Sequence, residues 1–243
     1  MKIIKLNAID STNSFLKKMT LENSVSNFTV VITESQEKGR GQMNAKWVSE
    51  AGKNLTFSVF FEVKNVLVSN HKYLNFAVSL SVFNVLKKYN LPNLFIKWPN
   101  DIMAANKKVC GILIENSLKG MHINTSVVGI GLNVNQIDFP VDLPQASSLK
   151  MLTGDNFNLD NLLHEIIDAL KVNVDLLNNQ SYNVLEDAYL KVLYKKNVPS
   201  MFKTAQNVLF LGKIIGVGNT GKLQIALEDE TIQEFDIKEV SFA

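Results

Sequence analysis

The sequence predicts an α+β fold, in which a mixed β-sheet with flanking helices is followed by a small C-terminal β-barrel. A chain of 243 residues is long enough for one large domain with a small appendage. Apolar, strand-like runs and amphipathic helical patterns share the first part of the chain. After Pro199 the pattern changes to short β-rich runs separated by turn residues. We therefore predict two domains, at residues 1–192 and 193–243.

The individual elements follow from hydrophobic periodicity. Runs of apolar and β-branched residues predict strands at 3–9, 28–33, 55–62 and 125–134. Apolar residues that recur every three or four positions predict helices at 71–89, 161–177 and 184–194. A further helix is expected to begin at the sequence DSTN, residues 10–13, because these residue types favour helix N-caps.

The stretch from Phe95 to Glu115 contains two strand-like runs joined by a polar reversal at residues 105–108. The first run delivers Lys97, Asn100 and Asp101 together at its end. Gly111, inside the second run, indicates that another group approaches the backbone closely there. A surface hairpin with solvated lysines would collect the same residue types. Two other glycine- and amide-rich strand ends in the chain favour a binding site over that interpretation.

Composition excludes several classes of function. The net charge is +2, with both signs mixed along the chain, so we expect neither a nucleic-acid nor a membrane partner. No apolar run reaches the length of a membrane span, and the first residues lack a signal-peptide core, which predicts a cytoplasmic protein. A single cysteine, Cys110, excludes an internal disulfide and is expected in the core. Any metal should be Mg²⁺ that a phosphate ligand brings.

Three segments have the chemistry of a ligand site. Hydroxyl and free N–H groups at the start of the helix at 10–13 can bind a polar group. In the Gly39 to Trp47 loop, Arg40 can pair with a phosphate or carboxylate and Trp47 can cover a ring. The run VVGIGLNVN, residues 127–135, permits close backbone approach at its two glycines. Because this run opens no helix, it is not a dinucleotide-binding motif.

Taken together, these segments resemble the biotin protein ligases along essentially the whole chain. The matching motifs are DSTN (10–13), ESQEKGRGQ (34–42) with Trp47, KWPNDI (97–102), KKVCGILIE (107–115) and GIGLNVN (129–135). The resemblance implies a catalytic domain like those of class II aminoacyl-tRNA synthetases and an SH3-like C-terminal barrel. It also implies a two-step reaction: biotin and ATP, with Mg²⁺, form biotinyl-5′-AMP, and a lysine of a biotin carboxyl carrier protein then attacks this intermediate.

The resemblance also assigns residues. It implies that Lys108 and Arg40 are catalytic, because bringing a carboxylate to a phosphate requires fixed cations. The implied biotin contacts are Ser11, Thr12, Asn13, Gln36, Gly39, Arg40, Gly41, Gln42, Trp47, Lys108 and Gly111. The implied ATP and Mg²⁺ contacts are Lys97, Asn100, Asp101, Gly131 and Asn133, with the metal held through Asp101 or Asn133.

The sequence departs from the family pattern at two places. Many family members have a more basic loop, whereas this chain has Gln42, Asn44 and Ala45 at the later positions. We therefore predict faster leakage of the adenylate than in an arginine-rich relative. Only nine residues precede Asp10, which leaves no room for the DNA-binding module of bifunctional relatives and predicts that the chain is not a repressor.

Two alternative functions stay open at this point. A lipoate or octanoate ligase shares the fold and the chemistry, although its basic R-R-x-x-G-G-G loop and later K-x-x-G-N-A pattern are absent. A non-catalytic biotin-binding protein could keep the vitamin site, but it would not need both Lys108 and Arg40. The resemblance makes a homodimer through sheet edges an expectation as well.

Overall fold

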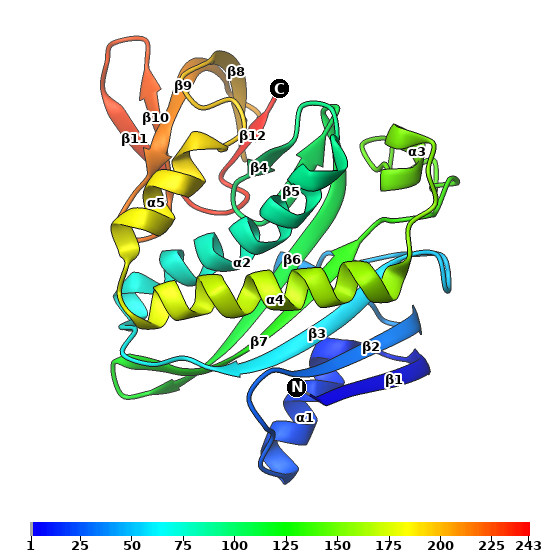
Figure 1. Cartoon of the computed structure of the whole chain (residues 1–243). Helices are drawn as coiled ribbons and strands as arrows, with labels where there is room; N and C mark the ends of the chain where they lie inside the picture. Colours follow the sequence, from blue (N-terminus) through cyan, green and yellow to red (C-terminus); the bar gives the residue numbers. More distant parts are fainter. Residues whose placement is uncertain (1) are drawn as a thin grey trace.

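The computed structural model describes residues 2–243, and a seven-stranded sheet forms its centre (Figure 1). The strand order is β1-β2-β3-β7-β6-β5-β4. Only β1 and β2 are parallel to each other, and every other neighbouring pair is antiparallel. The strands are β1 (Lys2–Ile9), β2 (Thr29–Gln36), β3 (Leu55–Glu62), β4 (Phe95–Lys97), β5 (Asp101–Ala104), β6 (Lys107–Lys119) and β7 (His122–Leu132).

Helices cover both faces of this sheet. One face carries α2 (His71–Leu86), α4 (Leu159–Asn178) and α5 (Tyr182–Lys191), and the other carries α1 (Thr12–Glu22) (Figure 1). Successive side chains of β2 point to opposite faces of the main sheet. Val30 belongs to the large core under α2 and α4, whereas Val31 packs with Leu16 of α1. The short helices are η1 (Gln42–Asn44), η2 (Val68–Asn70), η3 (Lys87–Tyr89) and α3 (Leu149–Thr153).

The C-terminal part of the chain forms a separate five-stranded antiparallel sheet of order β11-β10-β9-β8-β12. Its strands are β8 (Pro199–Thr204), β9 (Leu209–Val217), β10 (Leu223–Leu227), β11 (Ile232–Phe235) and β12 (Val240–Phe242). Stacked rings of Phe202, Phe210 and Phe235 connect these strands on the inner side. Within residues 2–243 no strand pairing joins β11 to β12, so the predicted small barrel takes the form of a sheet without that closure.

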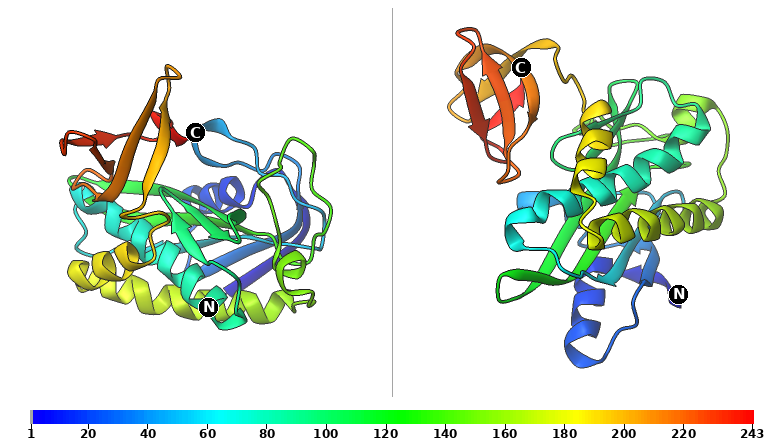
Figure 2. Two further views of the ribbon diagram at one scale, coloured as in Figure 1. Left: turned by 90° about the horizontal axis from the view of Figure 1, so that it is seen from above. Right: turned by 60° about the vertical axis from the view of Figure 1, so that its left-hand side comes forward.

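Contacts of the linker and of the turn between β9 and β10 hold the C-terminal sheet against the first one. The backbone of Ile96 in β4 bonds to Val192 and Tyr194, which extends the main sheet by the linker. The Trp98 indole donates to the carbonyl of Gly221 at 3.0 Å. Figure 2 shows the C-terminal sheet standing above one end of the main sheet.

The predicted fold class is confirmed, but the prediction for the Phe95 to Glu115 stretch is partly wrong. It contains three strands rather than two, because a tight turn at Trp98–Asn100 lets residues 101–104 pair with both neighbours. The second reversal occupies only Ala105 and Asn106, which both have positive φ angles (48° and 60°). The helix predicted at 71–89 ends at Leu86 and continues as the 3-10 turn η3.

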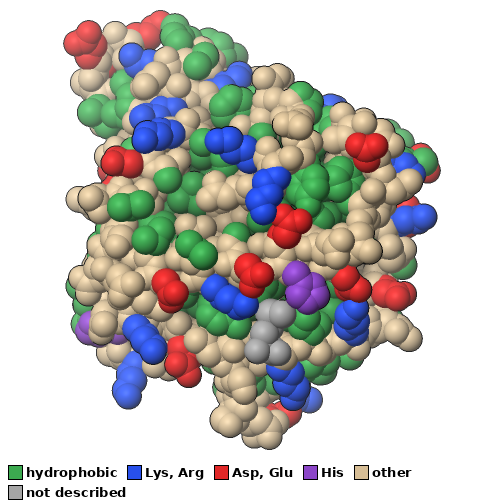
Figure 3. All heavy atoms as spheres, in the orientation of Figure 1, with side chains coloured by type: hydrophobic (Ala, Val, Ile, Leu, Met, Phe, Trp, Pro, Cys, Tyr) green, Lys and Arg blue, Asp and Glu red, His purple; other side chains and the backbone are tan. Residues whose placement is uncertain are grey.

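Cys110 and the surface charges follow the sequence expectations. The thiol is fully buried in the core, and burial raises the pKa of Cys110 well above its usual range, so the side chain is a packed thiol. Acidic and basic side chains are interspersed on the face formed by α2 and α4 (Figure 3). No helix in the described part of the chain is long and apolar enough to cross a membrane.

Candidate functional site

A hollow over the middle of the main sheet forms because glycines sit side by side on the face that also carries α1. Across four strands, Thr56, Gly131, Gly111 and Asp101 lie directly opposite one another in register. In the next row, Gly129 of β7 lies between Ser58 and Leu113. Three positions on this face therefore carry no side chain, which lets other groups approach the sheet backbone closely.

The side chains that close over these glycines come from two segments far apart in the sequence. A Cβ atom at Gly131 would lie 2.3 Å from Trp47 Cε2, and one at Gly111 would lie 3.1 Å from Trp47 Cζ3. A Cβ atom at Gly129 would lie 2.4 Å from Asn13 Oδ1. The close approach that Gly111 indicated in the sequence therefore comes from Trp47 and from the Lys108 side chain.

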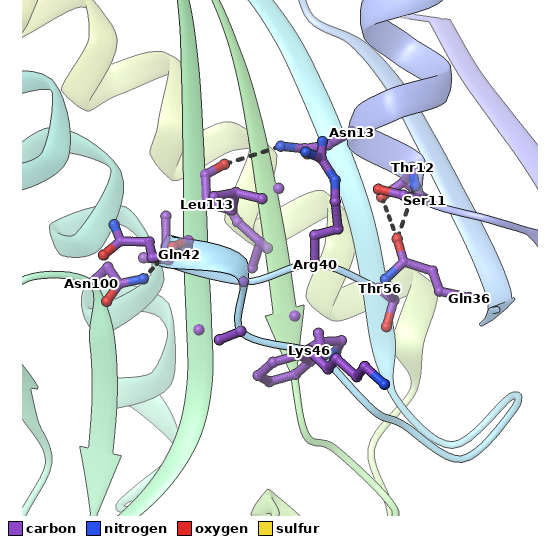
Figure 4. Close-up of a pocket in the computed structure, with 18 of the residues that line it drawn as sticks. Ser11, Thr12, Asn13, Gln36, Arg40, Gln42, Lys46, Thr56, Asn100 and Leu113 are labelled. Carbon is purple, nitrogen blue, oxygen red and sulfur yellow. Dashed lines mark hydrogen bonds between the residues drawn. The ribbon is translucent and has the colours of Figure 1, made fainter. Parts of the chain in front are cut away.

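A network of short polar side chains lines the end of the hollow next to α1 (Figure 4). Gln36 Oε1 accepts hydrogen bonds from the Thr12 amide at 2.8 Å and the Thr12 hydroxyl at 3.1 Å. Ser58 Oγ lies within hydrogen-bond distance of Thr12 Oγ1, at 2.7 Å, and of Asn13 Oδ1, at 2.5 Å. The position of the helix N-terminus explains this arrangement, since Ser11 caps α1 by accepting from the Ser14 amide. The network offers donors and acceptors within a few ångströms of each other.

Two cations of the site are each paired with a carboxylate. Lys108 Nζ lies 2.7 Å from Asp101 Oδ1, and Arg40 Nη2 lies 3.0 Å from Glu115 Oε2. Glu115 also accepts from Asn13 at 2.9 Å and pairs with Lys17 at 2.7 Å. Burial by itself raises the pKa of Glu115, but the bonds from Lys17 and Asn13 and the charge of Arg40 outweigh burial and hold that pKa below its ordinary value.

The cavity above the glycines brings together most of the residues assigned from the sequence. Those that line it are Ser11, Thr12, Asn13, Gln36, Arg40, Gly41, Gln42, Trp47, Asn100, Asp101, Lys108, Gly111 and Gly131. Gly39, Lys97 and Asn133 do not line it. Gly39 closes the loop by accepting from the Trp47 amide, and Lys97 Nζ instead lies 5.6 Å from the centroid of the Phe242 ring.

Asn133 belongs to a second cavity, which shares Lys46, Trp47 and Lys108 with the first. The loop at residues 139–146 lines its other side. Asn133 donates to the Ser147 carbonyl at 3.0 Å, while its Oδ1 atom is buried without a hydrogen-bond partner in the described chain. Gln42 Oε1 and Trp47 Nε1 are buried in the same unpartnered state. Since buried polar groups are normally bonded, these three atoms indicate that the two cavities are built for a polar ligand.

Several residues of the site were not assigned from the sequence. Thr56, Ser58 and Glu115 lie on the same face as the glycines, and Glu115 connects Arg40 to Asn13. The signal for the first two is the alternation of polar and apolar residues in LTFSVFFE, residues 55–62, which places both on the face opposite the large core. Gly129 lies in the same sequence run as Gly131. Like Gly131, it has no side chain and so leaves room above the sheet for another residue, in this case Asn13.

No group of three or more His, Cys, Asp or Glu side chains that could hold a metal ion occurs in residues 2–243. Asp101 faces Lys108, and the Asn133 amide nitrogen bonds to the backbone. These two oxygen donors alone are too few for a protein-held Mg²⁺ site, but they fit a Mg²⁺ ion that arrives with most of its ligands on a phosphate chain.

Comparison with known proteins decides the family. Residues 6–133, which include the whole glycine row and the α1 network, match the model of the biotin/lipoate A/B protein ligase family. The chain belongs to this family. The match covers more than half of the chain and ends where β7 delivers Asn133.

Individual relatives of the chain are named as ligases. The chain is 25% identical over 234 residues to the bifunctional ligase/repressor BirA of Bacillus spizizenii, covering 93% of this chain and 70% of that protein. It is 34% identical over 142 residues to a biotin--[acetyl-CoA-carboxylase] ligase of Mycobacterium tuberculosis, covering 57% of this chain and 51% of that protein.

One solved structure resembles this chain along its whole length. It is a biotin protein ligase from Aquifex aeolicus in complex with biotin and ATP, with a TM-score of 0.81 and 28% identity. The similarity covers 100% of this chain and 98% of that one. The comparisons therefore support a ligase enzyme.

Proposed function

We propose that this protein is a biotin protein ligase, which activates biotin with ATP to biotinyl-5′-AMP and transfers the biotinyl group to a lysine of a biotin carboxyl carrier protein. The observation that carries the proposal is the polarity of the glycine hollow. Thr12, Asn13, Gln36 and Ser58 form a network at one end, and the Lys108 ammonium lies at the other end against Asp101. A ligand with a polar ring system at one end and a carboxylate at the other fits this arrangement.

The first step needs a cation where negative charge collects. As the biotin carboxylate attacks the α-phosphate of ATP, one carboxylate oxygen forms a bond to phosphorus while the bond to pyrophosphate breaks. Lys108 lies next to both cavities and 5.7 Å from the Trp47 ring centroid, so its ammonium can face the carboxylate and the phosphate together. Arg40, in the Gly39 to Trp47 loop, stabilises the same negative charge. Trp47 excludes water from the mixed anhydride, which would otherwise hydrolyse.

The nucleotide belongs to the second cavity in this scheme. Lys108 and Trp47 line this cavity, so the phosphates of a bound nucleotide would lie next to the Lys108 ammonium. The Oδ1 atom of Asn133, which has no hydrogen-bond partner in the described chain, would then face the nucleotide. Mg²⁺ enters with ATP, and Asp101 or Asn133 supplies the protein oxygen. Asn100 donates to the Ile112 carbonyl and fixes the turn beside Asp101 rather than pointing freely at a phosphate.

Polarity also separates biotin from lipoate and octanoate, the other acids of this ligase family. The ureido group of biotin both donates and accepts hydrogen bonds, whereas the far ends of lipoate and octanoate do neither. An apolar end placed against Thr12, Asn13 and Gln36 would meet polar groups with which it can form no hydrogen bond. A site built to bond a polar group rejects an analogue that lacks it by about 10⁴-fold.

Pyrophosphate exchange tests the proposal directly. Labelled pyrophosphate should be incorporated into ATP in the presence of biotin and Mg²⁺, and not in the presence of lipoate or octanoate. Exchange with one of the other acids would replace the substrate assignment and leave the chemistry intact. If the folded protein bound biotin but supported no exchange with any of the three acids, it would be a binding protein.

Replacing Lys108 by alanine should separate catalysis from binding. We expect exchange to fall by about 10³-fold, because a charge stabiliser of the transition state is lost. Biotin affinity should change by less than about tenfold, since the polar network is at the other end of the hollow. Lys213→Ala is the matched control, because Lys213 is an exposed lysine of β9 that lines neither cavity. Equal effects of the two substitutions would contradict the role of Lys108.

The remaining assignments are proposals with their own tests. A carrier protein that presents its acceptor lysine should become biotinylated in the presence of biotin and ATP. A homodimer would use the strand β1, which is an edge of the main sheet, and sedimentation velocity would reveal it. We propose a cytoplasmic location, where ATP and carrier proteins meet.

A further inference from the structure

The loop from Gly39 to Trp47 covers the catalytic cavity, and hydrogen bonds within the loop join its two arms and close the turn at its tip, where the Ala45 amide donates to the Gln42 carbonyl at 3.0 Å. The Trp47 amide donates to the Gly39 carbonyl at 3.0 Å, and the Gly41 amide donates to the Ala45 carbonyl at 2.7 Å. Met43 at the tip has a φ angle of 50° and is 57% exposed. The left-handed region is unfavourable for an L-residue with a side chain. A contact from outside the loop would stabilise this strained tip.

That contact comes from the C-terminal sheet. Lys238, which precedes β12, donates from Nζ to the carbonyl oxygen of Met43 at 2.8 Å. The left view of Figure 2 shows this loop reaching the edge of the C-terminal sheet near the chain end. The bond joins residues 195 positions apart in the sequence, so it connects the two sheets at the mouth of the cavity.

The backbone that carries Lys238 is held firmly. Lys238 has a φ angle of 68° in a turn closed by the Glu239 amide, which donates to the Asp236 carbonyl at 3.1 Å. The Asp236 amide donates to Glu239 Oε2 at 2.6 Å, and the Ile237 amide donates to Asp236 Oδ1 at 2.7 Å. The bond from Trp98 to Gly221 fixes the same sheet to the first domain. The ammonium of Lys238 therefore extends from a fixed turn.

The loop tip is also next to the residues that close the cavity. Gln42, adjacent to Met43, lines both the catalytic cavity and a cavity between the two sheets that includes Asp236 and Ile237. We propose that Lys238 is a positioning residue of the ligase: by holding the Met43 carbonyl it keeps Gln42 and Trp47 over the bound intermediate. Its effect on catalysis rests on the proposed function, whereas its effect on the loop does not.

Limited trypsin digestion tests the effect on the loop without catalysis. Trypsin can cut the loop after Lys38, Arg40 and Lys46, and mass spectrometry measures each cleavage rate. We expect Lys238→Ala to raise these rates about fivefold, the factor that corresponds to one hydrogen bond of ordinary net strength. Lys238→Arg should restore the rates of the natural protein. Lys213→Ala is the matched control, since no hydrogen bond or ion pair of this exposed lysine of β9 occurs in the described structure.

Release of labelled biotinyl-5′-AMP tests the effect on the reaction. Lys238→Ala should release the intermediate about fivefold faster, while biotin-dependent exchange still occurs. The proposal is wrong if Lys238→Ala behaves like Lys213→Ala in both assays, if Lys238→Arg does not restore the loop, or if cleavage rises equally throughout the chain. If the natural protein showed no exchange, the ligase proposal would fail, and the digestion would still decide the role of Lys238.

Discussion

Replacing Gly131 by alanine tests whether the glycine row is the floor of the biotin site. The added methyl group would lie 2.3 Å from Cε2, 2.5 Å from Cζ2 and 2.7 Å from Nε1 of Trp47. Ordinary carbon contacts are about 3.5–4.0 Å, so the rigid indole must move by about 1 Å or more. Displacing a well-packed aromatic residue from a binding site costs about 2 kcal/mol. Biotin should therefore bind about 30-fold more weakly, as measured by isothermal titration calorimetry.

The fold should tolerate this change, because the obstructing atoms belong to a cavity side chain. We expect the midpoint of thermal unfolding to shift by only a few degrees. Gly216→Ala is the control, since a methyl group there has only Gln224 Oε1 nearby, at 3.4 Å. In a Trp47→Ala background, Gly131→Ala should have little further effect on affinity. The argument fails if Gly131→Ala leaves biotin affinity unchanged, or if it weakens binding equally in both backgrounds.

Two further predictions concern the charges around the loop. Glu115→Gln should lower the free energy of unfolding at pH 7, because the depressed pKa of Glu115 means that its ionised form stabilises the fold. This contribution is present above the ordinary pKa of 4.5 and disappears as the pH falls through the folded value, so denaturant titrations of the two proteins should converge in acid and differ above it. Gln42→Arg should slow release of the adenylate by about tenfold, the factor for a hydrogen bond to a charged group, and equal or faster release in a pulse-chase experiment would contradict the predicted leakage.

The residues of the cavity could be found from the sequence wherever a local pattern placed them. DSTN had to begin a helix, and it does so with Ser11 as the cap. The apolar runs had to be strands, and their polar or glycine interruptions marked the face that now carries the hollow. The same reasoning missed the strand at residues 101–104, because four residues between two turns have too short a pattern to show a period.

The amino-acid sequence alone determined the fold class, because periodicity and helix capping are local properties of the chain. Its motifs also resembled those of the biotin protein ligases, and that resemblance assigned most of the residues that line the cavity. Only the tertiary structure decided which groups meet. Strand register set Gly131 beside Gly111. The packing of the Gly39 to Trp47 loop put Trp47 over both glycines and paired Arg40 with Glu115. The fold also left Lys97 outside the cavity, next to Phe242. These contacts join residues far apart in the chain, and no local spacing encodes which of many possible partners packs against a given side chain.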